Sequence, residues 1–255
     1  METLTSSTYY QDTARVSKSQ LDALNRSPLH YWHRYLNPDY QPQITPALTF
    51  GKLFHTQLLT PDQFETNYIV NDADKRTSAY KDAKRHADAA GLTIVSGDDL
   101  LQVQTMIDAI KNHPLASKLL AMAGEAEKII EWTSGQTLCK SMIDKYIPGL
   151  NVVIDFKTTD DASPSGFLRS VKKYRYHVQG AFYSDAVKSL TGTAPDFILI
   201  AVEKTAPHPV AVYHLNPDAI EQGRAEYLAN LQTLQTCRET NNWPSYSNEL
   251  LTLNF

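Results

Sequence analysis

The chain has 255 residues, 42% of them hydrophobic, with a formal net charge of −4 and a pI near 6.0. This length and apolar content suit one compact domain with a substantial core. The longest apolar run, residues 197–202, is too short to span a membrane, and residues 1–15 lack the features of a secretory signal, so we expect a cytoplasmic protein. Cys139 and Cys237 are the only cysteines and lack metal-ligand spacing, which indicates neither a disulfide scaffold nor a zinc or iron–sulfur site.

Helical signals fill the first half of the chain. Residues 1–15 are polar, so we expect a flexible terminus followed by a single domain from 16 to 255. Ser17 to Gln20 fits a capping box, and Pro28 stands at the first position of a second helix. Further helices are predicted at residues 47–59, 75–90, 96–110 and 114–123. We expect an all-helical layer up to about residue 123 and a core that contains the strands from about 124 onward.

Strand signals dominate the second half. Apolar and β-branched runs predict a first strand at 126–132, a hairpin at 137–159 and two more strands at 195–203 and 209–215. Helices are predicted at 163–190, with a break, and from Pro217 to about 240. This order of elements predicts an α/β fold with a mixed central sheet flanked by helices.

The predicted hairpin carries three charged side chains in an otherwise apolar pattern: Asp144, Asp155 and Lys157. If the hairpin turns about residues 149–150, its antiparallel register sets Asp144 opposite Asp155, and the two-residue period puts Asp155 and Lys157 on one face. Opposed carboxylates destabilise a sheet unless a cation lies between them, and hard oxygen ligands favour Mg²⁺ over zinc. The alternative is a surface hairpin whose charged side chains are solvated or paired with each other.

A basic run with interleaved aromatic residues follows the hairpin. Its members include Lys172, Lys173, Arg175 and Tyr176. Because the net charge is −4, any DNA contact must be local, and this run is its candidate, although a charge run is also typical of a solvated surface.

Gln179 and Tyr183 come next and share one helix face, because they are four residues apart. An amide and a phenol so placed can reach one phosphate, or they can simply pack in the helix interface.

Several motifs carry a resemblance to a known family. Asp144 followed after ten residues by Asp155-Phe156-Lys157 resembles the PD-(D/E)XK nuclease signature, and residues 153–159 together with 179–183 resemble its RecB-type branch. Residues 16–21 with Ser27-Pro28, residues 51–55 and residues 176–179 are similar to the exodeoxyribonuclease VIII (RecE) nuclease domain of phages and prophages. The similarity runs from about residue 17 to 244. One departure is Met142-Ile143, where that family usually has Arg-Pro.

This resemblance implies a PD-(D/E)XK nuclease-like core and a set of site residues. Asp144 and Asp155, with the Phe156 carbonyl, would hold Mg²⁺, for which Mn²⁺ can substitute. His55 would be a metal ligand or would hold water on the metal, and Glu127 would join the metal shell. Taken alone, a helical histidine is more typical of a surface or core position, and Glu127 of an exposed strand.

The resemblance also implies roles in catalysis. Lys157 would orient the attacking water and stabilise developing charge, while Gln179 and Tyr183 would position the nucleotide end. The implied activity is that of a processive 5′ to 3′ exonuclease on double-stranded DNA, used in phage-type recombination. Its expected partners are duplex ends, a single-strand annealing protein and further copies of the chain, in a ring tetramer.

A rival interpretation is a catalytically impaired protein that binds DNA ends or phage partners and keeps the nuclease fold. The Met142-Ile143 departure favours it. The joint presence of Asp144, Asp155 and Lys157 favours the nuclease.

Overall fold

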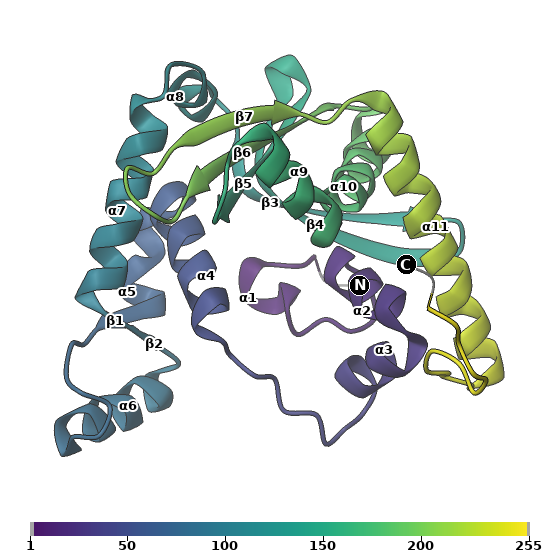
Figure 1. Cartoon of the computed structure of the whole chain (residues 1–255), viewed down its shortest axis with the longest axis horizontal. Coiled ribbons are helices and arrows are strands. Elements are labelled where there is room, and N and C mark those ends of the chain that lie inside the picture. Colours follow the sequence, from purple (N-terminus) through teal and green to yellow (C-terminus); the bar gives the residue numbers. More distant parts are fainter. Residues whose placement is uncertain (1–2, 254–255) are drawn as a thin grey trace.

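The computed structural model describes residues 3–253, and its centre is a mixed five-stranded sheet with the strand order β3-β4-β5-β6-β7 (Figure 1). The strands are β3 (Glu125–Ser134), β4 (Thr137–Ile147), β5 (Val152–Thr159), β6 (Asp196–Glu203) and β7 (Val210–His214). β5 and β6 run parallel, and the other neighbouring pairs run antiparallel. The predicted α/β fold with a mixed sheet flanked by helices is therefore confirmed.

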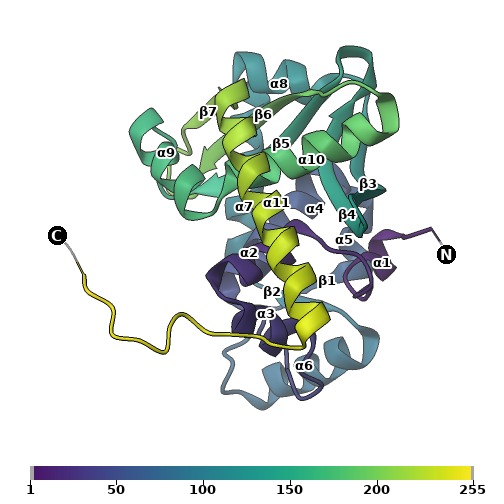
Figure 2. The ribbon, with the colours of Figure 1, turned by 90° about the vertical axis from the view of Figure 1, so that its right-hand side faces the viewer.

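Helices cover both faces of this sheet, and Figures 1 and 2 show α11 running down one side of the molecule. The α-helices are α1 (Ser6–Tyr9), α2 (Lys18–Arg26), α3 (Pro28–Tyr35), α4 (Pro46–Leu59), α5 (Phe64–Asn67), α6 (Ser78–Ala90), α7 (Gly97–Asn112), α8 (Pro114–Ala121), α9 (Pro164–Lys173), α10 (Tyr176–Thr191) and α11 (Pro217–Thr240). Short 3₁₀ turns lie at η1 (Pro61–Gln63) and η2 (Pro148–Leu150). None of the helices within residues 3–253 combines the length and the apolar character that a bilayer crossing requires.

Each sheet face has its own apolar cluster. Along β5, Val153 packs with α10 and α11 on one face, while Ile154 and Phe156 pack with α4 and α7 on the other. β6 alternates in the same way, with Phe197 on the first face and Ile200 on the second. Parallel strands buried on both faces read as continuous apolar runs, and Asp155 is a fully buried exception within such a run.

The central hairpin has the predicted register. Lys145 pairs with Ile154, Tyr146 with Val153 and Ile147 with Val152, which is the register predicted from the sequence. The ladder between β4 and β5 ends at Lys145 and Ile154, and beyond it the Asp144 side chain accepts the Phe156 N–H. The strand pattern therefore places both aspartates at the opening of the hairpin.

Two expectations for the first half are corrected. β1 (Tyr68–Val70) and β2 (Thr93–Val95) form a small parallel pair next to α6, so the layer is not all helical. Strands of three residues are too short to show a two-residue period in sequence.

Residues 3–15 do not lie apart from the domain, as was expected from their polarity. Tyr9 is buried, and the Arg15 guanidinium lies 2.5 Å from the Glu131 carboxylate on β3. Just beyond, Val16 donates its N–H to Leu138 O at 2.8 Å and accepts from Lys140 N at 2.8 Å. Because buried polar side chains provide these contacts, apolar content alone did not reveal the packing.

Candidate active site

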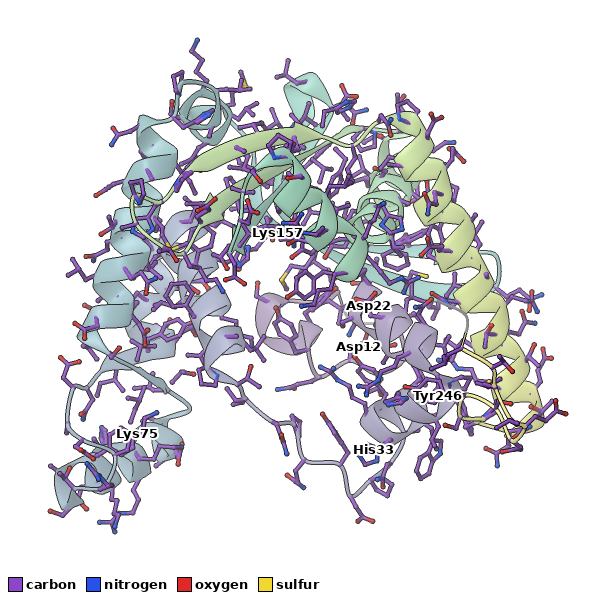
Figure 3. The ribbon with its side chains drawn as sticks, viewed as in Figure 1. Asp12, Asp22, His33, Lys75, Lys157 and Tyr246 are labelled. Carbon is purple, nitrogen blue, oxygen red and sulfur yellow. The ribbon has the colours of Figure 1, made fainter. Side chains whose placement is uncertain are left out.

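A cleft of about 1070 Å³ lies between the sheet and the N-terminal helices, with walls from α1, α2, α4, β3, β4, β5 and α10. Figure 3 shows Lys157 near the middle of the molecule, at this junction. Predicted site residues lie along its lining: His55, Glu127, Asp144, Lys157, Tyr176, Gln179 and Tyr183. Residues that are far apart in sequence are therefore brought to one place.

Asp144 and His55 form a tightly bonded pair on one side of the cleft. Asp144 Oδ2 accepts the Phe156 N–H at 2.8 Å and lies 3.1 Å from His55 Nε2. The same Nε2 is 3.0 Å from Phe156 O, and His55 Nδ1 is 2.9 Å from Gly51 O on α4. Since carbonyl oxygens only accept, both ring nitrogens must donate, as in the charged imidazolium.

The charges of this pair agree with that protonation. Burial alone would lower the pKa of His55, but the charge and hydrogen bond of Asp144 raise it to about 9. Burial would raise the pKa of Asp144, but His55 and Lys157 bring it below its ordinary value. The pair is thus ionic at neutral pH.

Asp155 lies beneath the cleft floor and is 0% exposed. Its Oδ1 accepts from Gln179 Nε2 at 2.7 Å, and its Oδ2 lies 2.6 Å from Lys157 Nζ. That short contact is an ion pair, and the Lys157 ammonium is the one charged group that the structure places against Oδ2 among the described residues. Burial raises the pKa of Asp155 to about 6, against the opposing charge of Lys157.

Lys157 remains an ammonium group at neutral pH. Burial lowers its pKa, but the negative charges of Asp155 and Asp144 together raise it above the ordinary value. Its Nζ lies 4.7 Å from the centre of the Tyr176 ring. The positively charged Lys157 side chain therefore lies in the cleft beside Asp155.

Glu127 lies level with Asp144 on β3, because its neighbours Ala126 and Lys128 pair with Lys145 and Ile143. Its φ of 47° is rare for a non-glycine residue and interrupts the ladder at this level. Burial and the charge of Asp144 raise the pKa of Glu127. The carboxylates of Glu127 and Asp144 therefore occur at one level across β3 and β4.

Gln179 and Tyr183 both reach the cleft from α10, as their four-residue spacing predicted. Gln179 is held by its bond to Asp155, so it links the helix to the buried carboxylate. Burial raises the pKa of Tyr183 well above its ordinary value, so its phenol stays neutral.

The predicted DNA contacts divide into two groups. Lys172 and Lys173 are exposed, and Lys173 Nζ lies 5.1 Å from the Tyr174 ring centre. Arg175 is different, since its side chain is 12% exposed and donates to Asp22, Glu226 and Asn230. Arg175 ties α2 to α11, which corrects its assignment as a phosphate contact.

Part of the cleft lining was not predicted from the sequence. Tyr9, Tyr10 and Lys52 line it, yet Tyr9 and Tyr10 belong to the segment expected to be loose. Two adjacent tyrosines in an otherwise polar stretch were the available signal. Glu131, four residues after Glu127 on β3, pairs with Arg15.

The donor set suits a hard divalent cation. Within residues 3–253, no group of three or more His, Cys, Asp or Glu side chains is arranged as a ready metal cage. Asp144 and the Phe156 carbonyl nevertheless meet at His55 Nε2, the charge of Asp144 acts on Asp155, and the buried Asp155 Oδ2 is paired only with the Lys157 ammonium among these residues. Oxygen ligands of this kind are those that Mg²⁺ uses, so the residues fit such an ion.

Comparisons with known proteins bear on the family and the fold of the chain. Residues 17–253 match the protein family described as PDDEXK-like domain of unknown function (DUF3799). A solved structure from Eubacterium rectale, called a putative exonuclease, has 17% sequence identity and a TM-score of 0.74, and the match covers 100% of this chain and 97% of that one.

Two other solved structures have lower TM-scores. A phage related exonuclease from Haemophilus somnus has a TM-score of 0.38 at 10% identity, covering 87% of this chain and 95% of that one. The alkaline exonuclease LHK-Exo from Laribacter hongkongensis has a TM-score of 0.36 at 10% identity, covering 92% and 95%. No curated protein matches.

The family match confirms the PD-(D/E)XK prediction across nearly the whole chain, and the Eubacterium rectale structure confirms the fold. The chain belongs to the PDDEXK-like family DUF3799.

Proposed function

We propose that this protein is a divalent-metal-dependent exodeoxyribonuclease that hydrolyses phosphodiesters from the ends of linear duplex DNA in the 5′ to 3′ direction. The observation that carries the proposal is the buried Asp155 carboxylate between Gln179 and Lys157, directly beside the Asp144 and His55 pair. Burying a carboxylate without a full set of hydrogen bonds destabilises a fold. A bound cation and a phosphate substrate would account for that arrangement.

Asp144, Asp155 and the Phe156 carbonyl would hold the cation, which when bound would supply Lewis-acid stabilisation and lower the pKa of water. In hydrolysis, a water oxygen bonds to phosphorus, the bond to the leaving sugar oxygen breaks, and that oxygen takes a proton. Lys157 keeps its proton and therefore donates to a phosphate oxygen as negative charge develops. The Tyr183 phenol stays neutral, so its O–H can donate a hydrogen bond to a phosphate oxygen. Gln179 holds the Asp155 carboxylate in place by a hydrogen bond.

End dependence is the sharpest test of the exonuclease. Linear duplex and covalently closed circles of the same sequence are incubated with Mg²⁺, and with EDTA as the control. We expect mononucleotides or short products from the linear form alone, with a 5′ label released before a 3′ label. Cleavage of closed circles would show an endonuclease. Uncut linear DNA that is still bound would instead favour the impaired end-binding protein.

A further inference from the structure

The matched family region begins at residue 17, but the cleft has a wall that precedes it. Residues of the segment 4–16 line the cleft opposite α4, among them Thr5, Tyr9 and Tyr10. A segment outside the matched region thus contributes surface directly beside the proposed catalytic residues.

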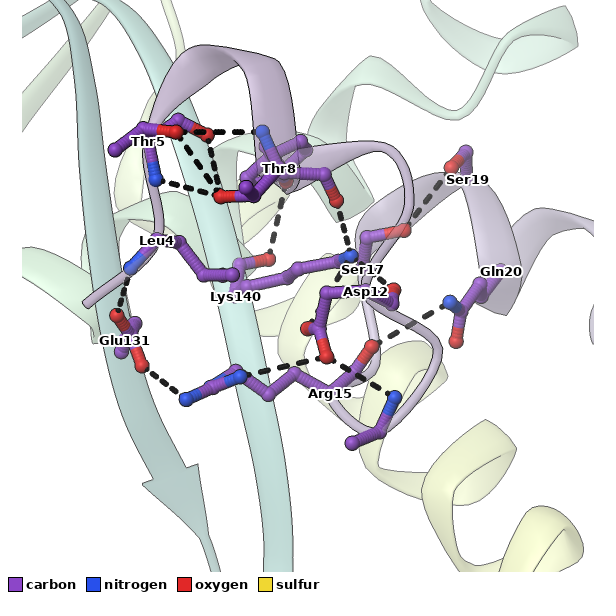
Figure 4. A network of polar contacts seen from close by, with 12 residues as sticks. Leu4, Thr5, Thr8, Asp12, Arg15, Ser17, Ser19, Gln20, Glu131 and Lys140 are labelled. Carbon is purple, nitrogen blue, oxygen red and sulfur yellow. Dashed lines mark hydrogen bonds and ion pairs between the residues drawn. The ribbon is translucent and has the colours of Figure 1, made fainter. Parts of the chain in front are cut away.

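Buried polar contacts hold this segment in place (Figure 4). Lys140 on β4 is 2% exposed, donates to the carbonyls of Tyr9 and Asp12, and pairs with the Asp12 carboxylate at 3.4 Å. The backbone of Val16 adds two hydrogen bonds to β4. An ammonium group enclosed by carbonyls fixes the backbone on both sides of Tyr10.

Tyr10 is an exposed aromatic residue of this wall. Its neighbour Tyr9 is 7% exposed, whereas Tyr10 is 69% exposed and lies in the cleft lining. The Tyr9 ring supports it edge to face at 5.3 Å, and its hydroxyl lies 3.9 Å from the sulfur of Met142. Met142 is two residues before Asp144 on β4, so Tyr10 stands over the strand that carries the catalytic carboxylate.

A cation accompanies this ring. Lys52 Nζ lies 5.1 Å from the Tyr10 ring centre, and no carboxylate pairs with Lys52 among residues 3–253. Lys52 precedes His55 by three residues on α4, so both side chains lie on one helix face, about 4.5 Å apart along the axis. An aromatic face and a cation therefore lie one helical turn from the Asp144 and His55 pair.

We propose that Tyr10 and Lys52 form a nucleobase subsite, in which the Tyr10 ring stacks on a base of the bound strand and Lys52 contacts a phosphate next to that base. Base stacking on aromatic rings is tolerant of sequence because every base has a π-face. The subsite rests on the proposed nuclease function and gives it a means of holding the end in register with the cleavage site.

A series of substitutions separates stacking from packing. Tyr10→Phe keeps the ring, while Tyr10→Leu keeps apolar bulk against Met142 but removes the ring. On short end-labelled duplexes with Mg²⁺, we expect Tyr10→Phe to stay near wild type and Tyr10→Leu to lose about tenfold in kcat/KM. On duplexes whose terminal nucleotides are abasic, wild type and Tyr10→Leu should be equal, because there is no base to stack.

Controls come from exposed residues outside the cleft. Tyr246 is 66% exposed and Figure 3 shows it far from Lys157, so Tyr246→Leu should leave cleavage unchanged. Lys52→Gln should reduce the salt dependence of DNA binding by about one phosphate contact, while Lys75→Gln, at the opposite margin in Figure 3, should not.

Each of these measurements tests whether the Tyr10 ring stacks on a base. Equal rates for Tyr10→Leu and wild type on normal ends, or the same loss on abasic ends, would overturn it. If wild type cleaves neither substrate, the nuclease proposal fails separately. The same Tyr10 series, read by fluorescence anisotropy of labelled duplex in EDTA, still supports or overturns base stacking.

Discussion

The two aspartates of the site have different neighbours and so different chemistry. Asp144 faces a charged His55 and a backbone N–H, which stabilise its ionised form. Asp155 is enclosed, and only Gln179 gives it a well-oriented hydrogen bond among the described side chains. Both carboxylates already have a cationic neighbour, Lys157 for Asp155 and His55 for Asp144, but burial raises the pKa of Asp155, so a bound metal ion would stabilise its ionised form more.

Lys157 should matter for turnover and little for metal affinity, because an ammonium group cannot be a ligand to a cation. We expect Lys157→Gln to lower kcat by about 100-fold, equivalent to about 2.7 kcal/mol of transition-state stabilisation. Mn²⁺ affinity by calorimetry should be kept or increased, because the variant removes a positive charge 2.6 Å from Asp155 Oδ2, and Lys75→Gln should behave as wild type. Loss of Mn²⁺ binding in Lys157→Gln would show that the division of roles is wrong.

The His55 and Asp144 pair should make the metal-free protein sensitive to alkaline pH. The folded pKa of His55, about 9, exceeds the ordinary value of 6.5, so its contribution is fully present below pH 6.5 and is lost as pH rises through 9. The loss is at most about 3 kcal/mol. Urea unfolding in EDTA at pH 6.5 and 9.5 measures it. His55→Gln should remove most of that pH dependence, and an unchanged slope would contradict the ionic pair.

At the scale of elements, sequence was most informative where apolar periods are long. The 137–159 hairpin could be predicted with its register, because Val152 to Phe156 and the preceding strand leave one consistent pairing. The N-terminal wall could not, since Lys140 and Asp12 hold it through buried polar contacts between distant segments. Arg175 was misassigned for the same reason: its partners Asp22 and Glu226 are far away in sequence.

The contact between α10 and α11 should tolerate no added methyl group, and α10 carries Gln179 and Tyr183. A Cβ on Gly223 would lie 2.2 Å from His177 O, a backbone atom that cannot move alone. We expect Gly223→Ala to lower the free energy of unfolding by about 1–3 kcal/mol and to reduce kcat. Gly149→Ala, with no atom within 4 Å of its Cβ, is the matched control for chemical denaturation. Equal stability of both variants would refute the close packing.

For the whole molecule, a net charge of −4 limits how DNA can be retained. When a few phosphate contacts hold DNA, each contact makes the affinity fall by about one log unit per log unit of salt concentration. We propose a homotetramer whose ring encloses the duplex, since enclosure slows dissociation without added charge. Light scattering should give four times the 28.7 kDa chain mass. With a heparin trap, loading should depend on salt far more than run length does. A monomer, or equal salt dependence of both, would contradict enclosure.

Asp155 is the residue on which the proposed cation site depends most. The most direct measurement is Mn²⁺ binding by calorimetry, paired with single-turnover cleavage of linear duplex, for wild type and Asp155→Asn. Asparagine keeps an oxygen that can accept from Gln179 but removes the charge. We predict that wild type binds Mn²⁺ and cleaves, and that Asp155→Asn remains folded, binds Mn²⁺ at least tenfold more weakly and loses at least 100-fold in rate. Equal Mn²⁺ affinity and equal cleavage by the two proteins would show that Asp155 does not hold a catalytic cation.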